Sequence, residues 1–379
     1  MNEVVRFIRE VHKQKDGFIP LHAPVFEGNE KQYLLDCIDS TFVSSVGEYV
    51  TRFEEQLALY TSVKKAVSVV NGTAALQVGM RIVGVEKSTE VITQALTFIA
   101  TANAISYLGA EPIFLDVDVD TMGLSPKAVG SFLEEHAELR EEACYNKTTG
   151  KRISACVPMH TFGFPVHLDE LFKICAKWNI PIVEDAAESL GSFYKGQHTG
   201  SYGKVGAFSF NGNKIVTSGG GGALVSNDEA LMVRAKHLTT TAKVPHSWEY
   251  VHDEVGYNYR MPNLNAALAC AQLERLDAYL ANKRKLAREY QAFFAEQSIK
   301  FRTETPNTKA NYWLMCVELE DKAERDAFLK TTNDAGVMTR PIWQLMHRLP
   351  MFANCMTDGL KNSEFFEDRI VNVPSSFRV

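Results

Sequence analysis

The sequence predicts an α/β protein in which a large domain holds a mostly parallel sheet and a smaller α/β domain follows it. Short runs rich in β-branched and aromatic residues lie between about residues 64 and 226, and segments with helical spacing separate most of them. After about residue 228 the pattern changes to a long helical stretch, a strand and a helix. We therefore expect a large domain over residues 1–245 and a smaller domain over residues 246–379.

The first expected element is a short amphipathic helix in MNEVVRFIREVHKQ, where Val4, Val5, Ile8 and Val11 have helical spacing. Charged residues interrupt its apolar pattern, so this segment lacks the apolar core of a signal peptide. The most apolar long window, VITQALTFIATANAISYL, contains Gln, Asn, Thr and Ser. It predicts a buried strand, loop and helix and not a membrane span.

The strand candidates of the large domain are KAVSVV, EVIT, EPIFLDV, ISACVPM, IPIVEDA, GAFSF and GALVS. Helical segments such as TAALQVGMRIV, TANAISYL, SPKAVGSFLEEH and HLDELFKICAKW lie between most of them. Strands that alternate with helices form a mostly parallel sheet that is covered on both faces. Only a short loop joins the last two candidates, so we expect one of them to run antiparallel to the rest.

Local signals predict several boundaries. Ser125 and Pro126 are suited to the cap and the first position of a helix. The charged stretch ELREEACYNKTTGKR predicts an exposed loop. In the smaller domain we expect one long helix over NLNAALACAQLERLDAYLANKRKLAREYQAFFAEQ, a strand in WLMCVELED, and a helix that ends at Gly336.

The composition limits the classes of function. The chain has 379 residues, of which 45% are hydrophobic and 23% charged, an ordinary globular profile. A net charge of -6 without a basic block argues against a nucleic-acid partner but allows a basic pocket for a phosphorylated small molecule. The seven cysteines include no C-x-x-C, so we expect no disulfide framework and no metal site. A reducing cytoplasm suits this pattern best.

Ligands of open α/β sheets bind beyond the carboxyl ends of the strands. The polar and aromatic residues expected there are Asn71 to Thr73, Thr97, Phe98, Asp116, His160, Asp185, Glu188, and Ser209 leading to Lys214. A helix follows NGT, and its free N–H groups could bind phosphate, although an ordinary turn with a Thr cap is equally consistent. Neither GxGxxG nor GxxxxGK[ST] occurs, so a dinucleotide fingerprint and a P-loop are not supported.

Two acidic residues, Glu184 and Asp185, close an apolar strand, where an unpaired carboxylate is costly. An arginine could meet one of them, or the protonated ring nitrogen of a cofactor could do so. Lys214 precedes four consecutive glycines, and taken alone it reads as a solvated loop lysine. A lysine amine, an acid, a phosphate seat and an aromatic ring at Phe98 are together the parts that hold pyridoxal phosphate.

Several motifs together resemble the DegT/DnrJ/EryC1/StrS family of pyridoxal-phosphate sugar aminotransferases. The matching segments cover nearly the whole chain and include VSSVGEYVTRFEE, NGTAAL, ALTFIATANAI, EDAAESLGS, AFSFNGNK and GYNYRMPNLNAAL. The resemblance implies fold type I, aspartate-aminotransferase-like, with a seven-stranded sheet. FIPLHAPVFEGNE, SFNGNKIVTSGGGG and TRPIWQLMHRLP are most similar to the LegC-like branch. That branch acts on UDP-linked 4-keto-6-deoxy-N-acetyl-hexosamines in legionaminic acid and bacillosamine pathways.

The resemblance also implies roles for the cofactor-binding residues. Lys214 would bind pyridoxal phosphate covalently and move the substrate proton, and Asp185 would pair with the pyridine nitrogen. Phe98 would stack on the ring, and Glu188 stands where many members have Gln beside the ring hydroxyl. The residues implied to bind the phosphate are Gly72, Thr73, Ser209 and, from the neighbouring subunit of a homodimer, Asn258.

Toward the nucleotide sugar the resemblance implies Arg260, Arg340, Trp343 and His347. His160, in PMHTFGFP, resembles an active-site position of the family, but a hydrogen-bonded structural histidine fits equally well. Trp178 and Trp248 are interpreted as packing residues.

Glutamate is the expected amino donor, and the expected product is the 4-amino sugar. Alternatives are the same reaction on a dTDP- or GDP-linked keto sugar, or a binding or regulatory protein that lost catalysis. The presence of Lys214 and Asp185 argues against a protein that lost catalysis. Lys214 also argues against a sugar dehydratase, in which histidine replaces the lysine.

Overall fold

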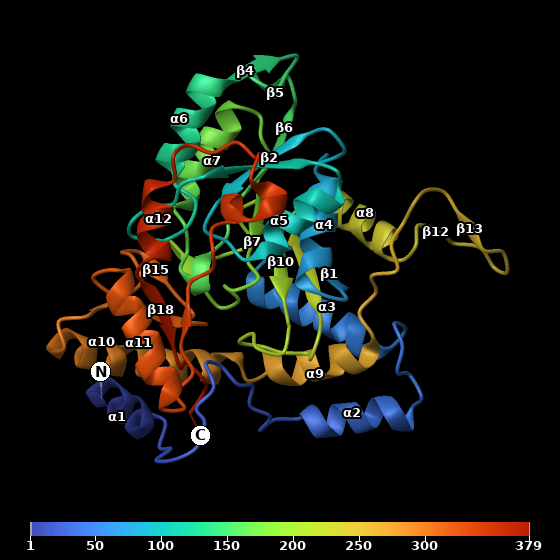
Figure 1. The fold of residues 1–379 in the computed structure, drawn as a ribbon. Coiled ribbons are helices and arrows are strands. Elements are labelled where there is room, and N and C mark those ends of the chain that lie inside the picture. The colour runs from blue at the N-terminus through green and yellow to red at the C-terminus, as the bar shows by residue number, and fades with distance from the viewer. Residues whose placement is uncertain (1, 379) are drawn as a thin grey trace.

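The computed structural model describes residues 2–378, and a seven-stranded sheet forms its centre (Figure 1). Two hydrogen-bonded ladders, ordered β1-β11-β10-β7 and β3-β2-β6, make up this sheet. Parallel bridges from Cys156 to Ile182 and from Met159 to Asp185 join the ladders. The strands are β1 (Lys65–Val69), β2 (Glu90–Gln94), β3 (Glu111–Leu115), β6 (Ile153–Val157), β7 (Val183–Asp185), β10 (Val205–Ser209) and β11 (Gly222–Ser226).

The strand directions match the expectation from the sequence. β2 runs parallel to β3 and β6, and β10 runs parallel to β7. β11 is antiparallel to both of its neighbours, β1 and β10. The prediction that one of the last two strands reverses direction is therefore confirmed for β11.

Helices cover both faces of the sheet, as the alternation of side chains in β11 illustrates. Leu224 packs in the apolar cluster that includes α4 and α8, whereas Ala223 and Val225 pack in the cluster that includes α3 and α9. Neighbouring strand residues point to opposite faces, so one strand serves both layers. The covering helices are α3 (Glu48–Thr61), α4 (Gly72–Ile82), α5 (Ile99–Tyr107), α6 (Pro126–His136), α7 (Leu168–Lys177), α8 (Glu229–Thr239) and α9 (Asn263–Leu273).

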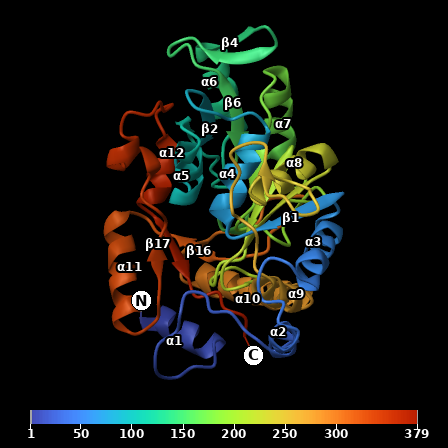
Figure 2. The same ribbon diagram turned by 90° about the vertical axis from the view of Figure 1, so that its right-hand side faces the viewer.

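A second, antiparallel sheet is built by the C-terminal part of the chain in the order β14-β16-β18-β17. Its strands are β14 (Lys300–Phe301), β16 (Met315–Glu318), β17 (Arg340–Pro341) and β18 (Ile370–Val373), with α10 (Leu276–Glu296) and α11 (Lys322–Asp334) beside them. The expected N-terminal helix is present as α1 (Asn2–Val11), and Figure 2 shows it next to α11. The division at residues 245 and 246 stays a prediction.

Two local expectations are wrong. The charged stretch after α6 is not an irregular loop but a hairpin of β4 (Ala137–Arg140) and β5 (Ala143–Asn146). Its two-residue turn places Glu141 and Glu142 at positive φ, a conformation that matches the twist of a hairpin. The single long helix is divided at Glu274 and Arg275 into α9 and α10.

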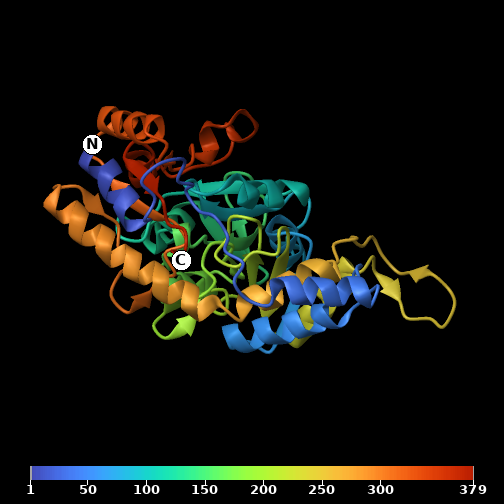
Figure 3. The same ribbon diagram turned by 90° about the horizontal axis from the view of Figure 1, so that it is seen from below.

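Further elements lie around these two sheets. A hairpin of β12 (Lys243–Val244) and β13 (Val251–His252) projects away from the body (Figures 1 and 3). No helix within residues 2–378 is long and apolar enough to span a membrane. The remaining elements are α2 (Glu30–Asp39), β8 (Phe193–Tyr194), β9 (Gln197–His198), β15 (Thr308–Lys309), α12 (Lys361–Glu367), and the 3-10 turns η1 (Thr161–Gly163), η2 (Met346–Arg348) and η3 (Pro350–Phe352).

Candidate active site

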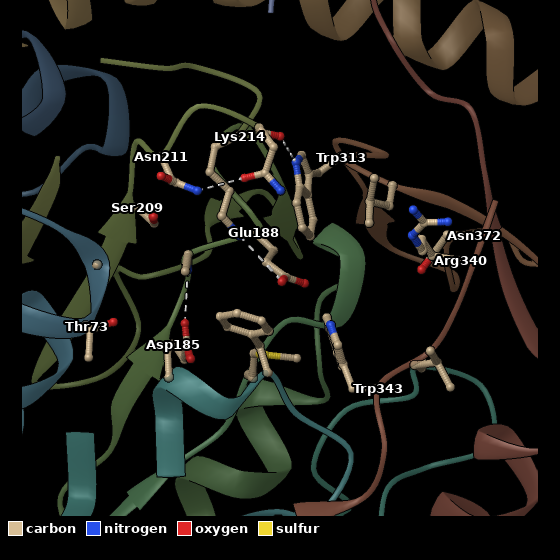
Figure 4. Close-up of a pocket in the computed structure, with 18 of the residues that line it drawn as sticks. Thr73, Asp185, Glu188, Ser209, Asn211, Lys214, Trp313, Arg340, Trp343 and Asn372 are labelled. Carbon is tan, nitrogen blue, oxygen red and sulfur yellow. Dashed lines mark hydrogen bonds and ion pairs between the residues drawn. The ribbon is translucent and has the colours of Figure 1, made fainter. Parts of the chain in front are cut away.

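A cavity of about 650 Å³ lies beyond the carboxyl ends of β7 and β10 and is closed on its other side by β17 and β18 (Figure 4). Asp185 and Ser209 are the last residues of their strands, which is why both reach this edge of the sheet. Residues named from the sequence that line it are Gly72, Thr73, Phe98, Asp185, Glu188, Ser209, Lys214, Arg340 and Trp343. One cavity therefore unites groups from distant parts of the chain.

The N-terminus of α4 forms one wall of the cavity. Its cap is Asn71, whose side chain accepts a hydrogen bond of 2.8 Å from the N–H of Ala74, so the alternative Thr cap is not observed. A Cβ on Gly72 would lie 2.7 Å from Cβ of Ser209, and one on Gly222 would collide with the carbonyl of Asn71. The last glycine of the run is thus required because β11 passes directly behind this helix end.

Asp185 is buried at the floor of the cavity. Thr101 donates to Oδ2 over 2.7 Å, and the N–H of Ala187 donates to Oδ1 over 3.2 Å. Burial raises the pKa of this carboxyl, and these two hydrogen bonds oppose the rise. Within residues 2–378 no arginine pairs with it, so the arginine expected as one alternative is absent there and a cation of a ligand would be well placed.

Lys214 extends into the cavity toward Glu188, with 3.5 Å between Nζ and Oε1. The other oxygen of Glu188 accepts from the N–H of Phe162 over 2.9 Å. Burial raises the pKa of Glu188 to about 7, although the nearby ammonium of Lys214 lowers it. A carboxyl with this pKa can change its protonation state when the charge of Lys214 changes.

An indole that the sequence analysis did not name covers Lys214. The centre of the Trp313 ring lies 3.9 Å from Nζ of Lys214, a cation–π distance. Its Nε1 donates to the carbonyl of Asn213 over 2.7 Å. Asn372, opposite Arg340 in β18, also lines the cavity without having been predicted. No local motif marks either residue.

A model of the DegT/DnrJ/EryC1/StrS aminotransferase family matches residues 24–379. The chain belongs to this family. EpsN of Bacillus subtilis (strain 168), named provisionally as a pyridoxal phosphate-dependent aminotransferase, is 36% identical over 335 residues, which cover 88% of this chain and 84% of EpsN. The GDP-perosamine synthase of Escherichia coli O157:H7 is 35% identical over 361 residues, which cover 94% of this chain and 93% of that enzyme.

A solved structure of DesV from S. venezuelae has a TM-score of 0.81 to this aminotransferase at 28% identity, over 92% of this chain and 89% of DesV. The protein is thus a pyridoxal phosphate-dependent aminotransferase of fold type I. The predictions of the family, the fold, the enzyme class and the cofactor are confirmed.

The cavity of this aminotransferase fits the cofactor of its family. Free N–H groups at the start of α4 and the hydroxyl of Ser209 suit a phosphate group. The buried carboxylate of Asp185, with no cationic partner among the described residues, suits a protonated ring nitrogen. Phe98, about half exposed at the cavity, offers an aromatic face.

His160, for which an active-site position and a structural role were equally consistent with the sequence, does not line the cavity. It is fully buried, and its Nδ1 accepts from the N–H of Val166 over 3.3 Å. Its Nε2 therefore carries the proton and donates to Glu184 over 3.1 Å. Its backbone N–H donates to the carbonyl of Asp185. These contacts match the structural alternative, and the geometry gives no support to a catalytic role.

Five other predicted residues, Thr97, Asp116, Asn258, Arg260 and His347, do not line the cavity of their own chain. Asn258 accepts hydrogen bonds from the guanidinium of Arg260, and both lie near the base of the projecting hairpin. His347 is in η2, and Asp116 caps the start of α12 by accepting from the N–H groups of Asn362 and Ser363.

The two packing predictions have different outcomes. Trp178 packs beside a buried apolar cluster, as expected. Trp248 is 79% exposed, so the packing expected for it does not occur within this chain.

Proposed function

We propose that this aminotransferase transfers an amino group from glutamate to C4 of a UDP-linked 4-keto-6-deoxy-N-acetyl-hexosamine, in the biosynthesis of a surface glycan of the legionaminic acid or bacillosamine type. The single observation that carries the proposal is the cavity. It joins Lys214 and Asp185 to a phosphate seat at one wall and to Arg340 and Trp343 at the other. The LegC-like motifs at both ends of the chain support this choice of sugar.

In this proposal the amine of Lys214 would hold the cofactor covalently, and its Nζ would carry the proton to and from the reacting carbon of the substrate. Pyridoxal phosphate supplies an electron sink for the bond that breaks. Asp185 keeps the ring nitrogen protonated, and Gly72, Thr73 and Ser209 bind the phosphate.

Both substrates use the same cavity in turn. The proposed mechanism therefore has two half reactions, first with glutamate and then with the keto sugar, and ping-pong kinetics follow from it.

An arginine and an aromatic ring at one wall of the cavity support binding of the nucleotide sugar. The guanidinium of Arg340 donates through Nη1 to Asn333 and to the carbonyl of Thr339, which leaves its other N–H groups for a diphosphate. Trp343 contacts Phe98 and Phe162 at the cavity wall and offers a ring face to a base. Arg348, in contrast, is paired with Glu364 and Glu367, so its charge is already compensated. His347 and Arg260 remain proposed substrate contacts.

A GDP-linked keto sugar is the second candidate because the similar Escherichia coli enzyme is named GDP-perosamine synthase. The decisive experiment presents the purified enzyme with UDP-, GDP- and dTDP-linked keto sugars and glutamate, and follows amine formation by mass spectrometry. Faster amination of a GDP- or dTDP-linked sugar overturns the UDP assignment and leaves the aminotransferase assignment intact.

The proposed lysine has its own test. Borohydride should attach the cofactor covalently to Lys214, and peptide mapping locates the attachment. Recovery of the cofactor on another lysine overturns the role of Lys214.

A homodimer with shared active sites completes the proposal. The projecting hairpin carries Trp248 and Tyr250, which are 79% and 82% exposed, and Val255 beyond it is 79% exposed. Exposed apolar side chains gathered on one extension are typical of an interaction surface. Asn258, near the base of this hairpin, would then reach the phosphate end of the partner's cavity, and Arg260 beside it would lie toward the nucleotide sugar.

A further inference from the structure

Helix α10 carries a lysine, Lys283, that is buried just behind the active site. Its side chain is 1% exposed, and no carboxylate within residues 2–378 forms an ion pair with it. Nζ donates to the carbonyl of Trp313 over 3.1 Å and to the carbonyl of Ser375. Burial lowers the pKa of this amine to about 7. Burying an amine without a counterion is costly, so we expect this side chain to have a structural or functional role.

The groups around Lys283 are nearly all cationic or neutral. His12 and His22 lie close to it and are partly buried, and burial lowers the pKa of both imidazoles. Glu289, which acts on His12, is paired with Arg378, so its negative charge is already compensated. The lysine therefore acts on the backbone carbonyls and not on an acidic partner.

Those carbonyl contacts fix the peptide of Trp313 from one side. Ser375 Oγ donates to the same Trp313 carbonyl over 2.8 Å. On the other side, the N–H of Trp313 donates to Oδ1 of Asn311 over 2.8 Å. Asn311 in turn donates to the carbonyl of Glu188 over 2.9 Å. The backbone of Trp313 is thus tied both to the C-terminal segment and to the loop that carries Glu188.

The indole of Trp313 connects this fixed backbone to the lysine of the active site. Nε1 of Trp313 holds the carbonyl of Asn213, the residue before Lys214, and the ring covers Nζ of Lys214. We propose that Lys283 is a positioning residue of the reaction: its buried amine fixes Trp313, and Trp313 fixes the Asn213–Lys214 peptide. The inference rests on the proposed role of Lys214.

The test compares Lys283→Met, which keeps much of the volume but removes the donors, with Trp313→Phe, which removes the indole N–H. Tyr290→Phe is the matched control. Tyr290 is on the same helix and equally buried, and it donates to the carbonyl of Pro374, next to Ser375, while none of its hydrogen bonds within residues 2–378 goes to Trp313. Ser375→Ala removes the second donor to the Trp313 carbonyl and gives a milder version of the same change.

The first measurement uses the cofactor-free protein. Hydrogen–deuterium exchange of the peptide that contains residues 210–217 should become faster in Lys283→Met and Trp313→Phe, and to a smaller extent in Ser375→Ala. Tyr290→Phe should leave it unchanged. Equal exchange in all variants, or the same increase in Tyr290→Phe, overturns the proposal.

The second measurement uses the holoenzyme. We expect Lys283→Met and Trp313→Phe to slow the glutamate half reaction about tenfold and to shift the pH at which the cofactor absorbance changes. The double variant should be no slower than Trp313→Phe alone, because both changes break one chain of contacts. Fully additive effects overturn the proposal.

Borohydride mapping of the wild-type enzyme keeps the two proposals separate. Attachment of the cofactor at another lysine removes the proposed function of Lys214, whatever the Lys283 variants do. Attachment at Lys214 combined with unchanged loop exchange removes the role of Lys283 alone.

Discussion

At the residue scale, the carboxyl groups of Asp185 and Glu188 have different surroundings although they lie only three positions apart in the sequence. Asp185 is held by a hydroxyl and a backbone N–H, whereas Glu188 lies beside the amine of Lys214. Burial raises the pKa of both. Of these two carboxyls, only Glu188 forms an ion pair with a basic side chain of the described residues, so its charge is coupled most directly to the state of Lys214, and Asp185 stays free for a cationic ligand atom.

Replacing Asp185 by asparagine tests this division. The side chains are nearly isosteric, and the amide oxygen can still accept from Thr101, so the unfolding temperature should change little. The amide cannot supply the negative charge that keeps a ring nitrogen protonated, and kcat should fall roughly 100-fold or more. Steady-state kinetics of the loaded variant measure this loss. A near-normal kcat would remove Asp185 from the mechanism.

Glu188→Gln tests the raised pKa in cofactor-free protein. A carboxyl whose pKa is higher in the folded than in the unfolded state stabilises the fold below the unfolded value, and the contribution is lost as the pH rises through the folded value. For Glu188 this window runs from 4.5 to about 7. The Gln variant should therefore gain in relative stability between about pH 5 and about pH 8, by up to about 3 kcal/mol.

Thermal or urea unfolding of both proteins at the two pH values gives the comparison. The free energy of unfolding of the Gln variant relative to wild type should be higher at about pH 8 than at about pH 5. A difference that is the same at both pH values contradicts a raised pKa.

At the scale of elements, the phosphate seat depends on how closely β11 approaches the start of α4. Gly222→Ala puts a Cβ against the Asn71 carbonyl, and we expect a loss of about 1–3 kcal/mol in unfolding free energy together with weaker cofactor binding. Gly212→Ala is the matched control, because nothing lies within 4 Å of its added Cβ. Cofactor titration and thermal unfolding of both variants check the prediction. Equal behaviour of the two variants would contradict it.

Much of the secondary structure and of the strand directions could be predicted from the sequence. The strand runs, the Ser125 cap and the reversal of β11 follow from local patterns, and so do the positions of Asp185 and Ser209 at strand ends. The β4–β5 hairpin was missed because its charges suggested a loop, while its turn uses the uncommon positive φ of Glu141 and Glu142.

The long-range part of the site could not be predicted from local patterns. Trp313 reaches Asn213 across 100 positions of sequence. Its own neighbourhood indicates only a buried strand, and its partner carbonyl has no side-chain signature. Asn372 could not be predicted for the same reason, because its position opposite Arg340 follows from the pairing of β17 with β18.

At the scale of the whole molecule, the projecting hairpin predicts an obligate dimer in solution, measurable by analytical ultracentrifugation. Lys214→Ala and Asn258→Ala should each be severely impaired. Mixed after subunit exchange, they should recover about a quarter of the wild-type activity, because half of the dimers are mixed and each has one intact site. No recovery despite confirmed exchange would count against a shared site.

The position of β1 has a consequence for synthesis on the ribosome. Its ladder partner is β11, from Lys65 with Ser226 to Val69 with Gly222, and an isolated bridge joins Val69 to Arg260, which lies still later in the chain. About 150 residues must therefore be translated before this strand finds its partner, which takes roughly 8–30 s at ordinary elongation rates. Throughout that time the nascent chain displays an apolar strand with open hydrogen-bonding groups. The yield of active enzyme should therefore depend on chaperone supply and growth temperature more than its final stability suggests.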